Sequence, residues 1–367
     1  MFSGVYKNKK VLVTGNTGFK GSWLSIWLYT LGAEVYGISN EIPTNPSLFE
    51  IADLSKIVNH SFEDIRNLEG LKKIIHDIKP DFLFHLAAQP IVKESYSNPL
   101  DTMTTNIIGT ANILESLRLA DFECTAIIIT SDKCYDNVEW EWGYKETDAL
   151  GGKDPYSASK GAAEIMVKTY FDSYFKHENS SIRVNSVRAG NVIGGGDWAA
   201  SRLVPDMFRS WSKQQTVTIR SPYSTRPWQH VLEPLSGYLR NGEALYKDKS
   251  LNGLAFNFGP NSDQNKTVLD LLVEIGKHIT KTEQFDLYNV ESNTSFHEAG
   301  LLKLNCDRAL HYLQWKPTLH FDETVEFTAR WYDTFYHQSN ADMLDLTTKQ
   351  ISDYIRKAEE RKNPWTN

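Results

Sequence analysis

The chain has 367 residues, with 39 Lys and Arg against 46 Asp and Glu, so its formal net charge is −7. Hydrophobic residues make up 41% and charged residues 23%, which excludes a disordered chain or a fibre and is enough for one large domain or two ordinary ones. The acidic balance excludes broad nucleic-acid binding, and no apolar run approaches the roughly 18–20 residues that span a bilayer. The three cysteines, at positions 124, 134 and 306, are too dispersed for a disulfide framework or a zinc site. We therefore expect a cytoplasmic protein that needs no metal, nucleic acid or membrane.

Two sequence periodicities alternate over the first 190 residues. Short β-branched runs predict strands at 9–15, 33–39, 81–88, 124–131 and 182–188. Apolar residues at helical spacing predict helices at 19–31, 68–78, 100–119 and 156–176. Strict alternation of strand and helix requires parallel pairing, because each helix carries the chain back across the sheet. The sequence thus predicts a doubly wound α/β fold of the Rossmann type, with its parallel sheet covered on both faces.

The pattern loosens after about residue 191, into short strands and separated helices near 202–213, 266–279 and 321–337. We interpret 1–190 as the dinucleotide-binding domain, which also receives part of 226–258. We interpret 191–367 mainly as a smaller α/β domain over the carboxyl edge of the sheet, where such folds bind ligands. A charged, weakly amphipathic helix over 343–362 is expected to be solvated or to lie at an interface.

A glycine-rich turn, TGNTGFKG, lies between the first predicted strand and the first predicted helix. Gly15, Gly18 and Gly21 permit a tight turn, close approach of a pyrophosphate to bare backbone, and close packing of helix on strand. The following helix N-terminus offers unpaired N–H groups to the phosphates. The spacing is G-x-x-G-x-x-G, so an ordinary βα turn is the alternative, but the strand before and the helix after favour a dinucleotide cofactor.

The end of the second strand gives no clear choice between NAD and NADP. Ser39 or Asn40 occupies the position where an acidic residue would bind the ribose hydroxyls of NAD, and no arginine there favours a 2′-phosphate. NAD is our expectation, and NADP is not excluded. Asp64 follows the third strand and could face an adenine amino group, although a solvated loop carboxylate is the alternative.

Tyr156 and Lys160 lie one helical turn apart in YSASK. A phenol, with an ordinary pKa of about 10, is a weak base at neutral pH. We expect the Lys160 ammonium, together with a nicotinamide cation, to lower the pKa of Tyr156 so that it can take a proton from a sugar hydroxyl. Asp132 and Lys133 follow Ser131 at the carboxyl end of a buried strand, and this favours an acid and a base. A surface Tyr-Lys pair and solvated loop charges are the alternatives.

Six motifs, in order, resemble the extended short-chain dehydrogenase/reductase family of nucleotide-sugar enzymes. They are TGNTGFKG, HLAAQ (85–89), TNIIGT (105–110), ITSDK (129–133), YSASK and VRAGNVIGGGDW (187–198). AAQPIVKESYSNP, TSDKCYDN and RPWQHVLEPLSGYL (226–239) narrow the resemblance to the CDP-glucose 4,6-dehydratases and extend it over most of the chain. In the related dTDP-glucose enzymes the turn reads Thr-Asp-Glu, whereas here Ser131 and Lys133 flank Asp132.

The resemblance implies a hydro-lyase that converts CDP-glucose to CDP-4-keto-6-deoxyglucose by internal hydride transfer through NAD. It implies that Tyr156, assisted by Lys160 and Ser131, takes the carbon-4 hydroxyl proton, that Asp132 protonates the carbon-6 hydroxyl, and that Lys133 takes the carbon-5 proton. It places the cofactor on Gly15, Asn16, Thr17, Gly18, Phe19, Lys20, Gly21, Asp64, Ile65, Leu86, Ala87, Ala88, Asn106, Tyr156 and Lys160. It places the nucleotide sugar mainly on residues 191–367. The implied contact residues are Gln89, Asn191, Arg202 and Arg226. Arg188 and Trp228 are either substrate contacts or structural residues.

The resemblance also implies a homodimer, in which helices 100–119 and 156–176 of two subunits form a four-helix bundle, and a role in deoxysugar biosynthesis such as that of lipopolysaccharide O-antigen. A nucleotide-sugar 4-epimerase is the alternative within the family, since it needs Tyr156, Lys160 and Ser131 but no acid and base at 132–133. A protein that senses NAD(P) without catalysis is the alternative of another class.

Overall fold

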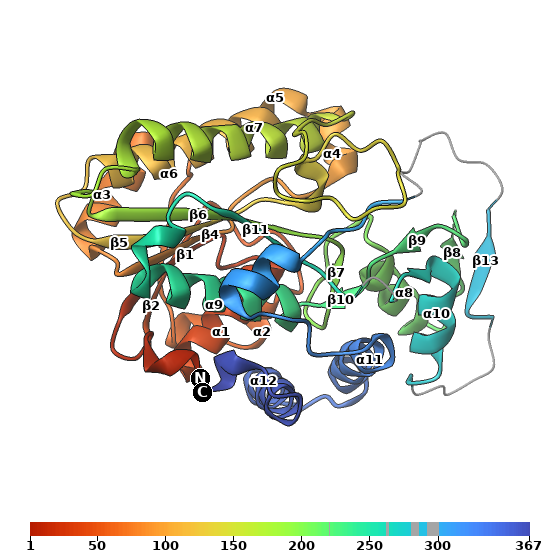
Figure 1. Ribbon diagram of the computed structural model, residues 1–367. Coiled ribbons are helices and arrows are strands. Elements are labelled where there is room, and N and C mark those ends of the chain that lie inside the picture. The colour runs from red at the N-terminus through yellow and green to blue at the C-terminus, as the bar shows by residue number, and fades with distance from the viewer. Residues whose placement is uncertain (220, 262–263, 280–285, 292–300) are drawn as a thin grey trace.

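The computed structural model describes the chain except for residues 220, 262–263, 280–285 and 292–300. Its centre is a seven-stranded sheet in the order β11-β6-β5-β4-β1-β2-β3, in which every neighbouring pair is parallel (Figure 1). The strands are β1 (Lys10–Thr14), β2 (Glu34–Ser39), β3 (Asn59–Phe62), β4 (Phe82–His85), β5 (Cys124–Ile129), β6 (Ile182–Ala189) and β11 (Ala255–Phe258). This arrangement confirms the predicted doubly wound parallel sheet.

Alternate side chains of the central strands enter two separate cores. Val11, Val13 and Phe82 belong to the core on one face of the sheet, and Leu12 and Leu83 belong to the core on the other. All five are fully buried, and each burial stabilises the fold by about 1.5–3 kcal/mol. Because both faces are apolar, helices must cover both.

The covering helices lie in two layers. The helices α3 (Leu68–Ile78), α6 (Gly109–Arg118) and α7 (Pro155–Tyr170) cover one face, and α1 (Phe19–Thr30) and α9 (Leu232–Lys247) cover the other (Figure 1). The predicted helix over 100–119 forms as α5 (Pro99–Met103), a π-turn at 104–108 and then α6. π-turns recur at functional positions, and this one contains Asn106.

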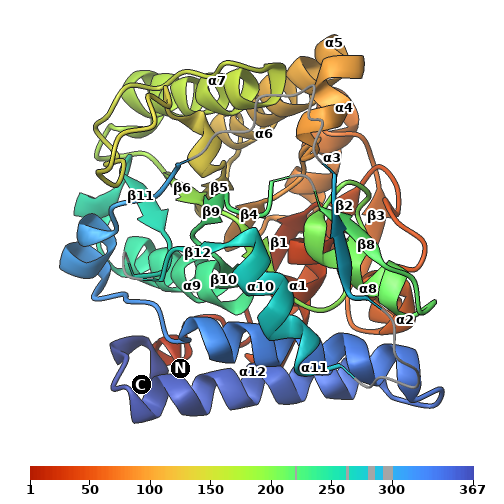
Figure 2. The same cartoon turned by 90° about the vertical axis from the view of Figure 1, so that its right-hand side faces the viewer.

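A smaller lobe lies beyond the carboxyl edge of the sheet, around α8 (Leu203–Trp211) and α10 (Val268–Gly276) (Figures 1 and 2). Three two-stranded ladders accompany these helices: β7 (Val192–Ile193) with β10 (Gln229–His230), β9 (Thr225–Arg226) with β12 (Lys266–Thr267), and β8 (Val217–Ile219) with β13 (Tyr288–Val290). Two short helices, α2 (Leu48–Ile51) and α4 (Val92–Ser97), follow β2 and β4.

The helix α12 (Met343–Glu360) lies beside α11 (Phe321–His337) and packs on α1 (Figure 2). Its Tyr354 ring is fully buried, with a centroid 5.7 Å from that of Trp27 on α1. The chain ends meet beside it, because the Trp365 ring stacks on Phe2 with centroids 5.2 Å apart. The expectation of a solvated or interface helix is therefore wrong. One narrow face of α12 is buried inside this chain, and the charged residues of the helix lie on either side of that face.

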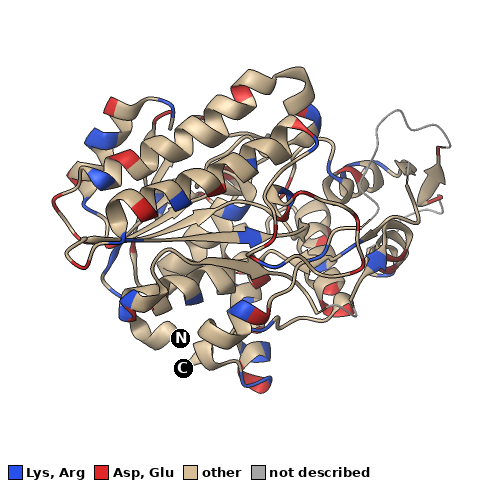
Figure 3. Cartoon of the chain, turned by 45° about the horizontal axis from the view of Figure 1, so that its top comes forward, with Lys and Arg blue, Asp and Glu red and all other residues tan. Residues whose placement is uncertain are grey.

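Charges of both signs are interspersed over the face that Figure 3 presents. Within the described residues, no helix is long and apolar enough to cross a membrane. In the same part of the chain, His, Cys, Asp and Glu form no group of three or more that could hold a metal ion.

Candidate active site

The glycine-rich turn between β1 and α1 is packed against the backbone that follows β4. Gly15 has φ +73°, and a Cβ atom there would lie 2.8 Å from the nitrogen of Ala87. A Cβ on Gly21 would lie 2.1 Å from the carbonyl oxygen of Gly15. Glycine is therefore required at both positions. Gly18 caps α1 at φ −78°, where the nearest atom to a Cβ would be the Gly15 oxygen at 3.4 Å.

Ser39 holds the glycine-rich turn through two hydrogen bonds. Its Oγ donates to Oδ1 of Asn16 at 3.0 Å and accepts from the backbone N–H of Thr17 at 3.3 Å. Asn16 is fully buried, and its Nδ2 has no hydrogen-bond partner among the described residues. The turn thus combines a bare backbone, a helix N-terminus and one buried donor that is not satisfied within the described chain.

Asp64 and Ile65 follow β3 at the same edge of the sheet. The carboxylate of Asp64 accepts hydrogen bonds from Arg66, the closest at 2.6 Å, and these bonds lower the pKa of Asp64. Ile65 is buried, and a Cβ on Gly109 would lie 2.4 Å from its side chain. Asp64 therefore already has a cationic partner, which the sequence did not indicate.

Asn106 joins the loop after β4 to helix α7. Its Nδ2 donates to the carbonyl oxygen of Gln89 at 3.1 Å and to Oγ of Ser159 at 2.9 Å, while its Oδ1 accepts from the N–H of Gln89 at 2.8 Å. The side-chain amide of Gln89 in turn donates to Oγ1 of Thr102 at 2.8 Å. Both predicted contact residues hold the loop 86–89 in place through their own hydrogen bonds.

Ser131 and Asp132 at the end of β5 lie beside Tyr156 at the start of α7, and Lys160 lies one helical turn further along α7. All four are buried, with exposed fractions of 4–8%. Asp154 caps α7 by accepting from the N–H of Ser157 at 2.9 Å, which fixes the first turn that carries Tyr156. Ser131 Oγ donates to Oδ1 of Asp132 at 3.0 Å, and the Ser131 side chain lies close enough to the Tyr156 phenol to lower its pKa.

Electrostatics at this cluster differ from the expectation for Tyr156. Burial raises the pKa of Tyr156 to about 12, although the hydrogen bond from Ser131 acts in the other direction. Burial also lowers the pKa of Lys160 to about 8 and raises that of Asp132 above its usual range. In the chain by itself, desolvation outweighs the attraction of nearby cations. The predicted lowering of the phenol pKa includes the charge of a bound nicotinamide, so it stays a prediction, while in the chain alone burial raises this pKa.

Two lysines lie beside this cluster. Lys133, half-buried, donates its backbone N–H to Ser131 Oγ at 3.3 Å. Lys20, which the resemblance gives to the cofactor, places Nζ 3.4 Å from the Tyr238 hydroxyl. Its pKa is lowered to about 8 by burial and by Arg202, while Asp132 acts the other way. Lys20 thus faces the catalytic groups, and neither Tyr238 nor this position of Lys20 was predicted.

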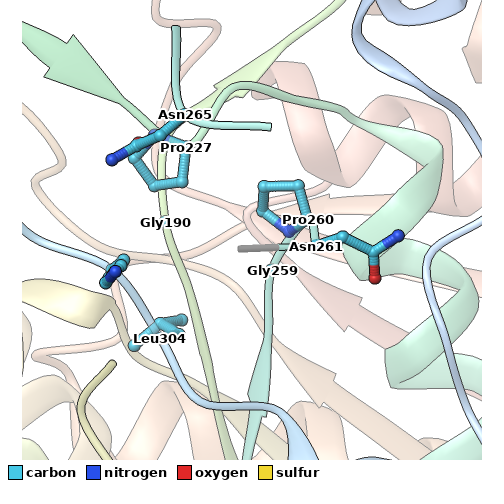
Figure 4. Close-up of a pocket in the computed structure, with 8 residues that line it drawn as sticks. Gly190, Pro227, Gly259, Pro260, Asn261, Asn265 and Leu304 are labelled. Carbon is cyan, nitrogen blue, oxygen red and sulfur yellow. The ribbon is translucent and has the colours of Figure 1, made fainter. Parts of the chain in front are cut away.

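A small pocket that is open to solvent lies just beyond the ends of β6 and β11 (Figure 4). Its lining comes from four segments that are distant in sequence: Gly190, Pro227, Gly259, Pro260, Asn261, Asn265, Lys303 and Leu304. A Cβ on Gly190 would lie 3.2 Å from Oδ2 of Asp132, which links the pocket to the acid. Oδ1 of Asn265 is buried without a hydrogen-bond partner in the described part of the chain. No sequence motif indicates this pocket, because its lining segments are distant from one another in the chain.

The predicted substrate residues on the smaller lobe lie near this pocket. Asn191 directly follows the pocket residue Gly190 in sequence, and Arg226 directly precedes the pocket residue Pro227. Nη1 of Arg226 donates to the carbonyl oxygen of Thr225 at 2.8 Å. Arg202 forms an ion pair with Asp197 at 2.8 Å and interacts electrostatically with Tyr156.

Arg188 and Trp228, for which the sequence left substrate contact and a structural role open, both have partners within the chain. Arg188 is buried and pairs with Glu164 at 2.8 Å. Trp228 is buried and donates from Nε1 to the carbonyl oxygen of Lys266 at 3.1 Å.

Comparison with known proteins identifies the family of this chain. The family model described as GDP-mannose 4,6 dehydratase matches residues 12–328. A CDP-glucose 4,6-dehydratase of Salmonella typhimurium is 44% identical over 95% of this chain and 97% of that protein. The chain belongs to the GDP-mannose 4,6-dehydratase family, within the extended short-chain dehydrogenases/reductases.

Members of the family and its structural neighbours carry several activities on nucleotide sugars. A CDP-paratose 2-epimerase of Salmonella typhi is 25% identical over 88% of this chain and 98% of that protein. The fold matches a dTDP-glucose 4,6-dehydratase of Bacillus anthracis in complex with NAD, with a TM-score of 0.72 and 19% identity over 92% of this chain and 99% of that chain. Family membership alone therefore leaves dehydration and epimerisation to be separated by the site.

Proposed function

We propose that this protein is a nucleotide-sugar 4,6-dehydratase that converts CDP-glucose to CDP-4-keto-6-deoxyglucose and water. The observation that carries the proposal is the position of Ser131 and Asp132 at the end of β5, beside Tyr156 on α7, because this set could supply both an acid and a base. An epimerase needs the phenol but not the acid. The 44% identity to a CDP-glucose 4,6-dehydratase supports the dehydratase and its CDP-linked substrate.

NAD is the proposed cofactor, and NADP is the alternative. The bare backbone at Gly15, the N-terminus of α1 and the unpaired donor of Asn16 suit a dinucleotide pyrophosphate. When bound, NAD supplies a hydride acceptor that later returns the hydride, so that none is consumed. Asp64, Ile65 and residues 86–88 would flank the adenosine side of the same edge.

The protein groups divide the proton transfers. Tyr156 takes the proton of the carbon-4 hydroxyl, with the Ser131 hydroxyl and the Lys160 ammonium stabilising its phenolate. The positive charge of a bound nicotinamide would act against the burial that raises the pKa of Tyr156. Burial raises the pKa of Asp132 and so favours the protonated carboxyl, which is the form that can donate to the departing carbon-6 hydroxyl. We assign removal of the carbon-5 proton to Lys133.

The nucleotide sugar is proposed to enter through the pocket beside Gly190. Arg226 and Arg202 are the proposed diphosphate contacts, because guanidinium groups match phosphate oxygens. Asn191 and Gln89 are the proposed contacts to the sugar. Because Arg202 and Gln89 already have partners in the chain, binding there requires shared or exchanged hydrogen bonds.

Mass spectrometry of reactions with CDP-, UDP-, GDP- and dTDP-hexoses plus NAD⁺ tests the function. We expect CDP-glucose to give a product lighter by one water. Epimerisation would leave the mass unchanged, and lack of turnover with every sugar would favour a protein that only senses NAD(P). The Asp132→Asn variant is expected to retain carbon-4 oxidation and lose dehydration.

We also propose that the protein is a homodimer. Leu100, Ile108 and Ile165 are 76%, 50% and 51% exposed and lie on α5, the π-turn and α7, which form one outer layer (Figure 1). Light scattering at micromolar concentration tests this, and a monomeric mass would overturn it.

We place the reaction in the cytoplasm, where nucleotide sugars and NAD are available. Its 4-keto-6-deoxy product would enter deoxysugar biosynthesis, such as that of lipopolysaccharide O-antigen.

A further inference from the structure

The loop 194–202, between β7 and α8, is packed against aromatic residues of two helices. The indole N–H of Trp23 on α1 donates to the carbonyl oxygen of Gly195 at 2.8 Å, and a Cβ atom on Gly195 would lie 2.0 Å from ring carbons of Trp331 on α11. The hydroxyl of Tyr332, also on α11 and fully buried, donates to the carbonyl oxygen of Asp197. These contacts fix the backbone at Asp197.

The carboxylate of Asp197 is buried and uses both of its oxygens. Oδ1 accepts from the backbone N–H of Ala199 at 3.0 Å, and Oδ2 forms an ion pair with Nη1 of Arg202 at 2.8 Å. The Asp197 side chain is 6% exposed, whereas the Arg202 side chain is 34% exposed. One end of the guanidinium is therefore held inside the protein, while the rest of the side chain can be reached from outside.

Most hydrogen-bond donors of Arg202 remain available. Within the described part of the chain, Asp197 is the only hydrogen-bond partner of the Arg202 side chain. A guanidinium has five N–H donors in a planar fork, so Nε and Nη2 are left for a ligand. The charge of Arg202 also acts on the Tyr156 phenol, in the catalytic cluster. Asp197 thus orients a cation whose free donors have no other partner in the described residues.

We propose that Asp197 is a positioning residue that holds the Arg202 guanidinium in place for the diphosphate of the nucleotide sugar. This inference rests on the proposed function, which assigns Arg202 to that diphosphate. A guanidinium that is already oriented loses less side-chain entropy when it binds phosphate oxygens. The carboxylate of Asp197 is itself negative and repels a diphosphate. The proposal therefore requires that the gain from orientation exceed this repulsion.

The test is a double-mutant cycle of Asp197→Asn and Arg202→Ala, measured by calorimetric titration with CDP, which has the diphosphate and no sugar. Asparagine keeps an oxygen for the Ala199 N–H and removes the charge that pairs with Arg202. We expect Asp197→Asn alone to weaken CDP binding about three- to tenfold. In the Arg202→Ala background the same substitution should have no further effect. Asp197→Glu, which displaces the guanidinium by one methylene, gives the same cycle if the asparagine variant does not fold.

Two controls separate positioning from general stability. Asp206→Asn breaks the ion pair of Asp206 with Arg209, which lies within α8 of the same lobe at 2.6 Å, and should leave CDP binding as in the wild type. Titration with NAD⁺ reports on the dinucleotide-binding domain and should be unchanged in Asp197→Asn.

Three results would overturn the role of Asp197. Equal weakening by Asp197→Asn with and without Arg202 would leave the ion pair as a structural support at the start of α8. Tighter CDP binding by Asp197→Asn would show that its charge only opposes the ligand. Unchanged CDP binding by Arg202→Ala would remove Arg202, and with it Asp197, from the substrate site.

The proposed function is judged separately, by loss of water from CDP-glucose. A wild type that binds CDP but releases no water would overturn the dehydratase function and not the role of Asp197. A wild type that does not bind CDP would overturn both.

Discussion

Arg188 and Glu164 form a buried ion pair directly behind the turn that carries Ser131. The guanidinium and carboxylate lie 2.8 Å apart, and each side chain is less than 5% exposed. Glu164 also accepts a hydrogen bond from Thr130, the residue before Ser131, and Arg188 donates to the Tyr135 hydroxyl at 2.8 Å. The pair therefore fixes the chain on both sides of the catalytic turn.

Removal of one charge from this pair should destabilise the fold. For Glu164→Gln we expect a loss of about 3–5 kcal/mol in the free energy of unfolding, because Arg188 stays buried with an uncompensated charge. Urea denaturation measures the loss. The matched control is Asp172→Asn, which breaks an exposed ion pair with Lys168 of α7 and should leave the free energy of unfolding close to that of the wild type. Equal losses in both variants would contradict the role of burial.

The carboxylate of Glu323 should make stability depend on acid pH. Burial alone would raise its pKa, but hydrogen bonds from Arg361 and Lys357 hold it at about 2, below the ordinary 4.5. A depressed carboxyl pKa stabilises the fold above pH 4.5, and this contribution is lost as the pH falls toward 2. We expect Glu323→Gln to flatten the pH dependence of the free energy of unfolding between pH 4.5 and about 2. The exposed Glu326→Gln should leave the profile as in the wild type.

The glycine-rich turn allows a paired test at two positions. Gly15→Ala places a methyl group 2.8 Å from the Ala87 nitrogen at a positive φ, so we expect lower thermal stability and loss of NAD binding. Gly18→Ala meets its nearest atom at 3.4 Å with a negative φ, so the chain should fold normally. Thermal melts and calorimetric titration with NAD⁺ measure both effects. A Gly15→Ala variant that melts and binds like the wild type would contradict the packing described here.

The assignment of Lys133 predicts a separation of two steps. Lys133→Ala should keep carbon-4 oxidation, seen as reduced-cofactor absorbance, and lose solvent-deuterium exchange at carbon 5. The exposed Lys153→Ala is the control and should exchange normally. Mass spectrometry and NMR of the recovered sugar measure the exchange. Normal exchange in Lys133→Ala would remove this amine from the mechanism.

Local patterns in the sequence were sufficient to predict the sheet and to locate the candidate catalytic cluster. Strand and helix periodicities are properties of neighbouring residues, and the order of these elements allows few topologies. Ser131, Asp132, Tyr156 and Lys160 follow from two short motifs that the parallel sheet brings to one edge.

Features that depend on tertiary packing were missed or wrong. The pocket joins Gly190, Asn265 and Lys303 from separate segments, which no motif connects. The raised pKa of Tyr156 depends on how much water the fold removes, and this quantity is not local. The burial of α12 was missed because its buried face is narrow and because its partner, the strongly apolar α1, is distant in sequence.

The packing of α12 on α1 joins segments that are synthesised at different times. Trp27 leaves the ribosome well before Tyr354 and Trp365, which cover it. Until α12 docks, the Trp27 indole on α1 therefore lacks part of its apolar cover.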